Sequence, residues 1–216
     1  MDQMTISAIL WDFGGVLTTS PFEAFNRFEA EHGIPADFIR RINATNPDGN
    51  AWAQFESSAI GLNEFDEAFA RESAAQGHRI PGRKVLELLS GELRPRMVEA
   101  LHSCKVSYQV ACITNNVKSG QGPAMASNRA RAAAMEGVMA LFDLVVESSI
   151  EGIRKPDPRI YELTCERLGV RPEQAVFLDD LGVNLKPARA LGMHTIKVVE
   201  ESQALEELGS LTGLAL

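Results

Sequence analysis

Two apolar segments of this 216-residue chain each end directly in aspartate. Residues 6–11 are followed by Asp12, and residues 175–178 are followed by Asp179 and Asp180. Short, nearly continuous apolar runs are typical of parallel strands that are buried on both faces. Ligands of open α/β sheets bind at the carboxyl ends of the strands, and an unpaired buried carboxylate is costly. These acids therefore predict a site for a cation and a phosphate rather than a packing role.

Strand-like and helix-like segments alternate along the second half of the chain. Strands are expected at 106–113, 144–147, 175–178 and 195–199, and helices at 95–103, 123–140, 159–168 and 185–191. Such alternation indicates βαβ units. The sequence predicts an α/β fold with a Rossmann-like, doubly wound parallel sheet.

Residues 21–91 interrupt this alternation with a helical pattern. Phe22, Phe25 and Phe28 recur at helical spacing on one apolar face, which is typical of packing inside a helical module. Because the block follows the first strand, we expect an inserted helical cap over the mouth of the sheet. The expected domains are a Rossmann-like core, residues 1–20 and 92–216, and a helical cap, residues 21–91.

The composition excludes several classes of partner. The net charge of −8 argues against binding to nucleic acid or to an anionic membrane. The three cysteines lack a CxxC spacing and predict neither a disulfide framework nor a zinc site. No apolar run approaches the ~20 residues that span a bilayer, and the start of the chain lacks a signal-peptide pattern. A cytoplasmic monomer or homodimer is the expectation.

Four short motifs occur in order, each at a predicted strand end or in an adjoining loop. They are DFGGVL at 12–17, TNN at 114–116, KP at 155–156 and DD at 179–180. Together they resemble the four motifs of the haloacid dehalogenase-like (HAD) hydrolase superfamily, over nearly the whole chain. Residues 176–193 also resemble the phosphatase domain of soluble epoxide hydrolases and the related domain fused to acyl-CoA dehydrogenases. The superfamily cap is inserted between the first two motifs, as residues 21–91 would be.

The resemblance implies a Mg²⁺-dependent hydrolase of small-molecule phosphate monoesters. Asp12 would be the nucleophile that forms an aspartyl-phosphate intermediate. Mg²⁺ would bind the carboxylate of Asp12, the backbone carbonyl of Gly14 and the carboxylate of Asp180. Asp179 and Asp180 could exchange roles, and Asn184 fits either a turn or a supporting position equally well.

The same resemblance assigns the phosphate-binding groups. Thr114, Asn115 and Asn116 would hold phosphate oxygens. Lys155 would offset the negative charge of the phosphate and of Asp12. Asp179 would orient Lys155. The implied partner is a small phosphorylated metabolite.

One position departs from the superfamily pattern. Most phosphatases of the superfamily carry a second aspartate two residues after the nucleophile, where this chain has Gly14. A general acid or base contributes ~10²–10⁴-fold, so its loss is serious without being fatal. Three hypotheses remain open: a phosphatase with a reduced or relocated acid, a 2-haloacid dehalogenase, and a catalytically weak domain that binds a phosphorylated ligand.

Overall fold

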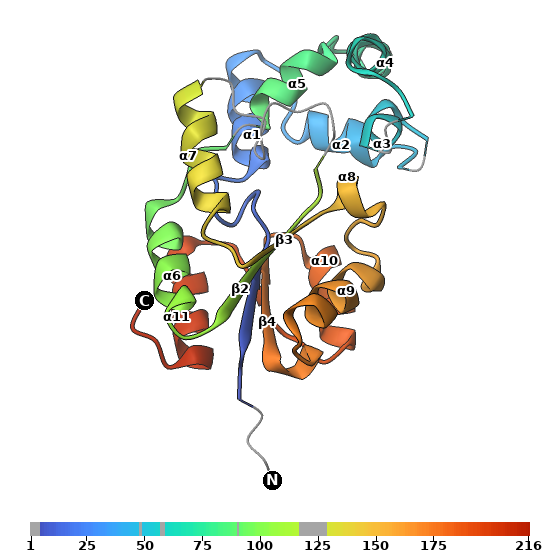
Figure 1. Cartoon of the computed structure of the whole chain (residues 1–216). Coiled ribbons are helices and arrows are strands. Elements are labelled where there is room, and N and C mark those ends of the chain that lie inside the picture. Colours follow the sequence, from blue (N-terminus) through green and yellow to red (C-terminus); the bar gives the residue numbers. More distant parts are fainter. Residues whose placement is uncertain (1–4, 48, 57–58, 90, 117–128) are drawn as a thin grey trace. The chain divides into compact units, whose positions relative to one another are not determined.

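The sheet of this protein has five parallel strands in the order β3-β2-β1-β4-β5 (Figure 1). The computed structural model describes residues 5–47, 49–56, 59–89, 91–116 and 129–216. The strands are β1 (Ala8–Trp11), β2 (Gln109–Thr114), β3 (Leu144–Glu147), β4 (Ala175–Asp179) and β5 (His194–Lys197). The parallel pairing and the flanking helices confirm the predicted α/β, Rossmann-like fold.

Strands β1 and β4 are adjacent at the centre of the sheet and are buried along their whole length. This burial explains why their sequences are nearly continuous in apolar residues. Their register pairs Trp11 with Leu178, so Asp12 follows one strand where Asp179 ends the other. The two acids are therefore neighbours at the carboxyl edge of the sheet.

Helices cover both faces of this sheet. Figure 1 shows α6 and α11 on one side and α9 and α10 on the other. The helices of this part of the chain are α6 (Pro95–Lys105), α8 (Ser148–Glu151), α9 (Pro158–Leu168), α10 (Gly182–Ala190) and α11 (Glu201–Thr212). A 3₁₀ turn, Pro172–Gln174, precedes β4. The arrangement makes a core on each side of the sheet, and both cores position the strand ends.

The start of α9 shows how local sequence places an element. Asp157 is the N-cap, and its side chain accepts a hydrogen bond from the backbone N–H of Arg159. Pro158 occupies the first helical position, where its missing N–H costs nothing. Gly169 ends the helix in the left-handed conformation that glycine adopts easily. Lys155 lies just before this well-defined helix start.

Some element boundaries differ from the sequence expectation. The strand predicted at 106–113 begins only at Gln109, because α6 continues to Lys105 and a turn follows it. In that turn Val106 is 85% exposed, and the N–H of Tyr108 bonds to the carbonyl of Cys104. Helix α11 was not predicted. Of the helix expected at 123–140, residues 123–128 lie outside the described residues, and α7 covers Arg129–Met139.

The chain forms two compact units. The first contains the sheet: residues Met1–Thr19, Glu92–Asn115 and Ala133–Leu216. The second contains Ser20–Gly91 together with Asn116 and the first residues of α7. Its other helices are α1 (Pro21–Glu31), α2 (Phe38–Ala44), α3 (Ala51–Glu56), α4 (Leu62–Ala75) and α5 (Gly82–Leu88).

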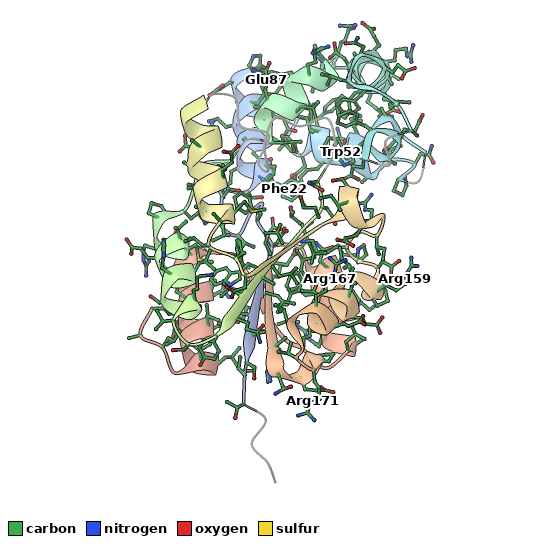
Figure 2. The ribbon with its side chains drawn as sticks, viewed as in Figure 1. Phe22, Trp52, Glu87, Arg159, Arg167 and Arg171 are labelled. Atoms are coloured by element: carbon green, nitrogen blue, oxygen red, sulfur yellow. The ribbon has the colours of Figure 1, made fainter. Side chains whose placement is uncertain are left out.

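The second unit has its own core of phenylalanine side chains. Phe55 stacks on Phe65 with ring centroids 4.5 Å apart, and Trp52, which is labelled in Figure 2, meets Phe65 edge-on at 5.8 Å. Aromatic pairs in such arrangements add to the free energy of burial. The phenylalanines of this segment are thus packing residues, and the function of the unit as a cap stays a prediction. Within the described ranges, no helix is both long and apolar enough to cross a membrane.

Candidate active site at the ends of strands β1 and β4

Asp12 and Asp179 point to the same side of the sheet. Leu10 and Phe177, two residues earlier on their respective strands, both belong to the core cluster beneath α9 and α10. Because side chains alternate along a strand, the two aspartates follow onto that same side. Asp12 is 8% exposed and Asp179 is fully buried. Two carboxylates on adjacent strands would repel each other, so the site requires a cation.

Lys155 supplies a positive charge between them. Its Nζ lies 2.8 Å from Oδ1 of Asp12 and 2.8 Å from Oδ2 of Asp179. The lysine side chain is 1% exposed, so both ion pairs are shielded from solvent. Burial lowers the pKa of Lys155, but the two aspartates outweigh this effect and leave the pKa raised. The ammonium therefore stays charged at neutral pH.

Asn115 fastens the Lys155 segment to the end of β2. Its Oδ1 accepts a hydrogen bond from the backbone N–H of Lys155 (2.9 Å), and its Nδ2 donates to the carbonyl of Lys155 (3.0 Å). This two-way bond resembles a short piece of sheet pairing made by a side chain. The role that the structure gives to the Asn115 amide is thus to position Lys155, and its predicted contact with substrate stays a prediction.

Asp179 is surrounded by hydrogen-bond donors. Besides Lys155, it accepts from the backbone N–H of Leu181 (2.8 Å), and Nδ2 of Asn184 lies 3.0 Å from each of its oxygens. The backbone carbonyl of Asn184 in turn accepts from the hydroxyl of Tyr161 (2.7 Å). Asp179 is therefore held in one orientation by Lys155 from the loop before α9 and by Leu181 and Asn184 at the start of α10.

Asp180 occupies a different environment, against the loop that follows β1. Gly15 has a positive φ of 78°, and a Cβ built on it would lie 2.5 Å from Cγ of Asp180 and closer still to Oδ2. A side chain at this position would displace the carboxylate. Gly15 is thus required both for the turn and for the approach of Asp180 to Asp12.

The three aspartates form a set of oxygen ligands. Carboxylate oxygens of Asp12, Asp179 and Asp180 all lie within 4.8 Å of one another. Burial, opposed by Lys155 and reinforced by Asp179 and Asp180, raises the pKa of Asp12 to about 7. Burial is the main cause of this rise, and the two neighbouring acids add to it. A hard divalent cation such as Mg²⁺ prefers oxygen ligands, so the residues present fit such an ion.

Two of the remaining predicted site residues, Thr114 and Gly14, lie at the same edge of the sheet. Thr114 ends β2, beside β1, and is 6% exposed. Gly14 lies in the loop after Asp12, and a Cβ built on it would meet nothing within 4 Å. Asn116 belongs by its contacts to the second unit. The structure thus brings Asp12, Lys155 and the two late aspartates together, while the roles of Thr114, Gly14 and Asn116 stay predictions.

Sequence reasoning did not assign Gly15 or Tyr161 and left Asn184 undecided. Asn184 could have been chosen because it is spaced five residues from Asp179 across a helix start. The contact of Tyr161 with the backbone of residue 184 has no signal in the sequence, since it joins two helices through packing.

Comparison with known proteins identifies the family to which this chain belongs. The family model of haloacid dehalogenase-like hydrolases matches residues 6–192. The chain therefore belongs to the haloacid dehalogenase-like hydrolase family.

Relatives of the chain include parts of larger enzymes. It is 36% identical to acyl-CoA dehydrogenase family member 10 of Mus musculus, over 97% of this chain and 19% of that protein. It is 31% identical to bifunctional epoxide hydrolase 2 of Mus musculus, over 97% of this chain and 39% of that protein. The chain thus spans well under half of these relatives. It is also 28% identical to the sesquiterpene phosphatase astK of Aspergillus oryzae, over 97% of this chain and 98% of that protein.

Solved structures share the fold. A HAD-like hydrolase from Porphyromonas gingivalis has a TM-score of 0.66 at 22% identity, covering 98% of this chain and 100% of the other. A HAD family enzyme from Bacteroides thetaiotaomicron, in complex with magnesium and inorganic phosphate, has a TM-score of 0.56 at 20% identity, covering 89% and 93%. The L-2-haloacid dehalogenase of Xanthobacter autotrophicus has a TM-score of 0.61 at 18% identity, covering 98% and 85%.

Proposed function

We propose that this protein is a Mg²⁺-dependent phosphatase of small phosphorylated metabolites, with Asp12 as its nucleophile. The observation that carries the proposal is the position of Asp12. Its carboxylate lies at the end of a central parallel strand, 2.8 Å from a buried lysine and within 4.8 Å of two further carboxylates. A nucleophile, a fixed positive charge and ligands for a cation are together what phosphoryl transfer to an aspartate needs.

We assign the attack on phosphorus to one oxygen of Asp12. Its Oδ1 accepts from the backbone N–H of Phe13 (2.7 Å) and contacts Lys155, so we assign Oδ2 to the attack. The Oδ2–phosphorus bond forms as the bond from phosphorus to the leaving oxygen breaks. Water then attacks phosphorus, the bond to Asp12 breaks, and inorganic phosphate is released.

Lys155 and Asp179 form a positioning pair in this scheme. Both oxygens of Asp179 already accept hydrogen bonds from Lys155, Asn184 and the N–H of Leu181. We therefore assign Asp179 to holding Lys155, and the lysine ammonium to offsetting charge on the transferring phosphoryl group. The assignment leaves Asp180 as the acid for the metal.

Mg²⁺ would be held by Asp12, the backbone carbonyl of Gly14 and Asp180. When bound, it would neutralise negative charge on the phosphate so that an anionic nucleophile can approach. The absence of a Cβ at Gly15 leaves room for the Asp180 carboxylate in this ligand set. Thr114 and Asn116 would hold phosphate oxygens, and residues 21–91 would select the substrate as a cap.

The relatives support a phosphatase at the level of reaction class. The relative named as a sesquiterpene phosphatase aligns over nearly its whole length, and the magnesium- and phosphate-bound neighbour has the same fold. The activities of the longer relatives concern proteins of which this chain spans 19% and 39%. We carry over only the class of small phosphate esters.

The direct test is phosphate release from p-nitrophenyl phosphate with Mg²⁺ and with EDTA. We expect turnover by the native chain with Mg²⁺, and none with EDTA or in Asp12→Asn, which keeps the size of the side chain but not its nucleophilicity. Turnover that persists in Asp12→Asn would refute the assignment of the nucleophile. Mg²⁺ should also raise the melting temperature of the native chain and not that of Asp180→Asn.

Two other functions remain distinguishable from this one. A 2-haloacid dehalogenase shares the fold, and its halide leaving group needs neither a proton nor a metal, which would suit Gly14. Halide release from 2-chloropropionate that EDTA does not inhibit would favour it. A domain that only binds a phosphorylated ligand would bind phosphate with Mg²⁺ and turn over no substrate. The cluster of three aspartates favours the metal-dependent phosphatase over the dehalogenase.

A further inference from the structure

The proposed reaction raises the question of how the leaving oxygen is protonated. When the ester bond breaks, the departing oxygen carries away negative charge. An alkoxide is a poor leaving group unless an acid protonates it, and such an acid contributes about 10²–10⁴-fold to the rate. A group that does this must reach the leaving oxygen while it is itself free to give up a proton.

The ends of the strands provide few candidates in the described residues of the first unit. Asp12 is the nucleophile, and Asp179 is saturated by donors that include Lys155. Lys155 Nζ lies 2.8 Å from a carboxylate oxygen of Asp12 and 2.8 Å from one of Asp179, so its N–H groups are directed at these two carboxylates. The histidines of this unit lie elsewhere: His102 is exposed on α6, and His194 begins β5 at the opposite edge of the sheet.

Glu147 is a further carboxylate at this edge. It ends β3, where its register partner is Thr114 of β2. Two strand spacings separate β3 from β1, which is about 10 Å. Val146 lies in the core cluster on the Asp12 side of the sheet, so alternation turns Glu147 to the opposite side. Glu147 is therefore poorly placed to reach an ester held on Asp12.

Gly14 offers space at the position where a donor could be added. Its backbone has no positive φ, and a Cβ built on it has nothing within 4 Å. Gly15, the next residue, would clash with Asp180 if it carried a side chain. The loop therefore accepts a side chain at one of these glycines and not at the other, and the native chain leaves the acceptable position empty.

We propose that this enzyme acts on phosphates whose leaving group departs as a stable anion, because the described residues at the strand ends of the first unit supply no proton for it. Acyl phosphates and aryl phosphates form this class, and simple alkyl phosphates do not. The inference rests on the proposed phosphatase function and narrows its substrate class. In the first step the leaving group takes both electrons of the broken phosphorus–oxygen bond and receives its proton from solvent.

The test measures how kcat/KM depends on the leaving group, instead of measuring the rate with a single substrate. kcat/KM is measured with Mg²⁺ for p-nitrophenyl phosphate, phenyl phosphate and an unactivated alkyl phosphate, because kcat/KM reports the phosphoryl transfer to Asp12 even where hydrolysis of the intermediate limits kcat. The variants are Gly14→Asp, which adds an acid, and Gly14→Asn, which adds nearly the same volume without one. Glu147→Gln tests the remaining carboxylate.

We expect the native kcat/KM to fall steeply from the nitrophenyl to the alkyl ester. Gly14→Asp should raise the ratio of alkyl to nitrophenyl kcat/KM by about 10²–10⁴-fold, while Gly14→Asn and Glu147→Gln should keep the native ratio. A native enzyme that hydrolyses both esters with similar kcat/KM would overturn the proposal, as would a steeper dependence in Glu147→Gln. Absence of turnover with every substrate would instead refute the phosphatase itself, so the two failures are distinguishable.

Discussion

Two buried carboxylates, one in each unit, are supported in opposite ways. Asp179 at the end of β4 receives an ammonium, a backbone N–H and a side-chain amide. Glu29 of α1 is also fully buried, but its Oε1 accepts from the N–H of Ile39 at the start of α2, and its Oε2 has no hydrogen-bond partner among the described residues. The first arrangement orients a charged group at the candidate site, whereas the second joins two helices.

The comparison teaches how to separate site residues from structural ones. At the strand ends, residues from several elements contact a few charged atoms, and the polar side chains there bond mainly to other polar side chains. In the second unit, a buried polar side chain forms hydrogen bonds mainly with nearby backbone groups. Substitutions in the two regions should therefore differ in size and in whether they affect metal binding.

The largest effect is expected at Lys155. Lys155→Met would leave Asp12 and Asp179 buried and facing each other without their cation. Breaking a buried ion pair costs about 3–5 kcal/mol, which urea unfolding would measure. The control is Lys105→Met, which removes a half-exposed ion pair with Asp143 and should cost about 0–1 kcal/mol. Equal losses in the two variants would contradict the special status of the buried pair.

A smaller effect is expected at Gly15. Gly15→Ala should lower the free energy of unfolding by about 1–2 kcal/mol because of the positive φ at this position. The clash with Asp180 should lower it by about 1–3 kcal/mol more. The variant should also lose the rise in melting temperature that Mg²⁺ gives. Gly33→Ala is the matched control in the second unit, because Gly33 has a φ of 63° and no atom within 4 Å of a built Cβ. A Mg²⁺ response in Gly15→Ala equal to that of Gly33→Ala would disprove the steric argument.

The next largest effect is expected at Asn184. Asn184→Ala removes the amide that bonds both oxygens of Asp179 and should destabilise the fold by about 1–3 kcal/mol. Asn50→Ala in the second unit removes a similarly buried amide that bonds backbone groups only. Both variants should unfold at lower urea concentration, but only Asn184→Ala should lower kcat with p-nitrophenyl phosphate. An unchanged kcat in Asn184→Ala would show that Asn184 has only a structural role.

The smallest effect is expected at Glu29. Glu29→Gln keeps the oxygen that accepts from Ile39 and breaks no ion pair in the described chain, so stability should change by less than about 1.5 kcal/mol. Asp179→Asn is the matched exchange in the first unit and loses charge-assisted hydrogen bonds worth about 1.5–3 kcal/mol. If Glu29→Gln proves as damaging as Asp179→Asn, the distinction between the two carboxylates is wrong.

The sequence allowed much of the fold and part of the site to be predicted. Parallel strands at the centre of a sheet must be apolar along their whole length, so β1 and β4 could be recognised, and the acids at their ends stand out by contrast. Boundaries were harder to predict where no sharp change in pattern exists. Residues 106–108 look like a strand because their local propensity is high, yet they form the turn after α6.

The placement of individual side chains was beyond prediction for a different reason. Asn115 could be expected near the phosphate, but its pairing with the backbone of Lys155 depends on two segments forty residues apart in the chain. Tyr161 and Asn184 meet because α9 and α10 pack side by side on one face of the sheet. Such contacts depend on the exact register of packed elements, which no local pattern encodes.

Residue order alone determined the class of fold, the edge of the sheet that bears the candidate site, and the identity of the charged groups there, because burial pattern and strand direction are local properties. Only the folded chain decided which aspartate holds the lysine and which faces Gly15, since these neighbouring residues are chemically identical in the sequence. Asp179 continues the alternation of β4 toward the core, while Asp180 begins the loop and turns away from it. This difference in side-chain direction places the two carboxylates in different environments.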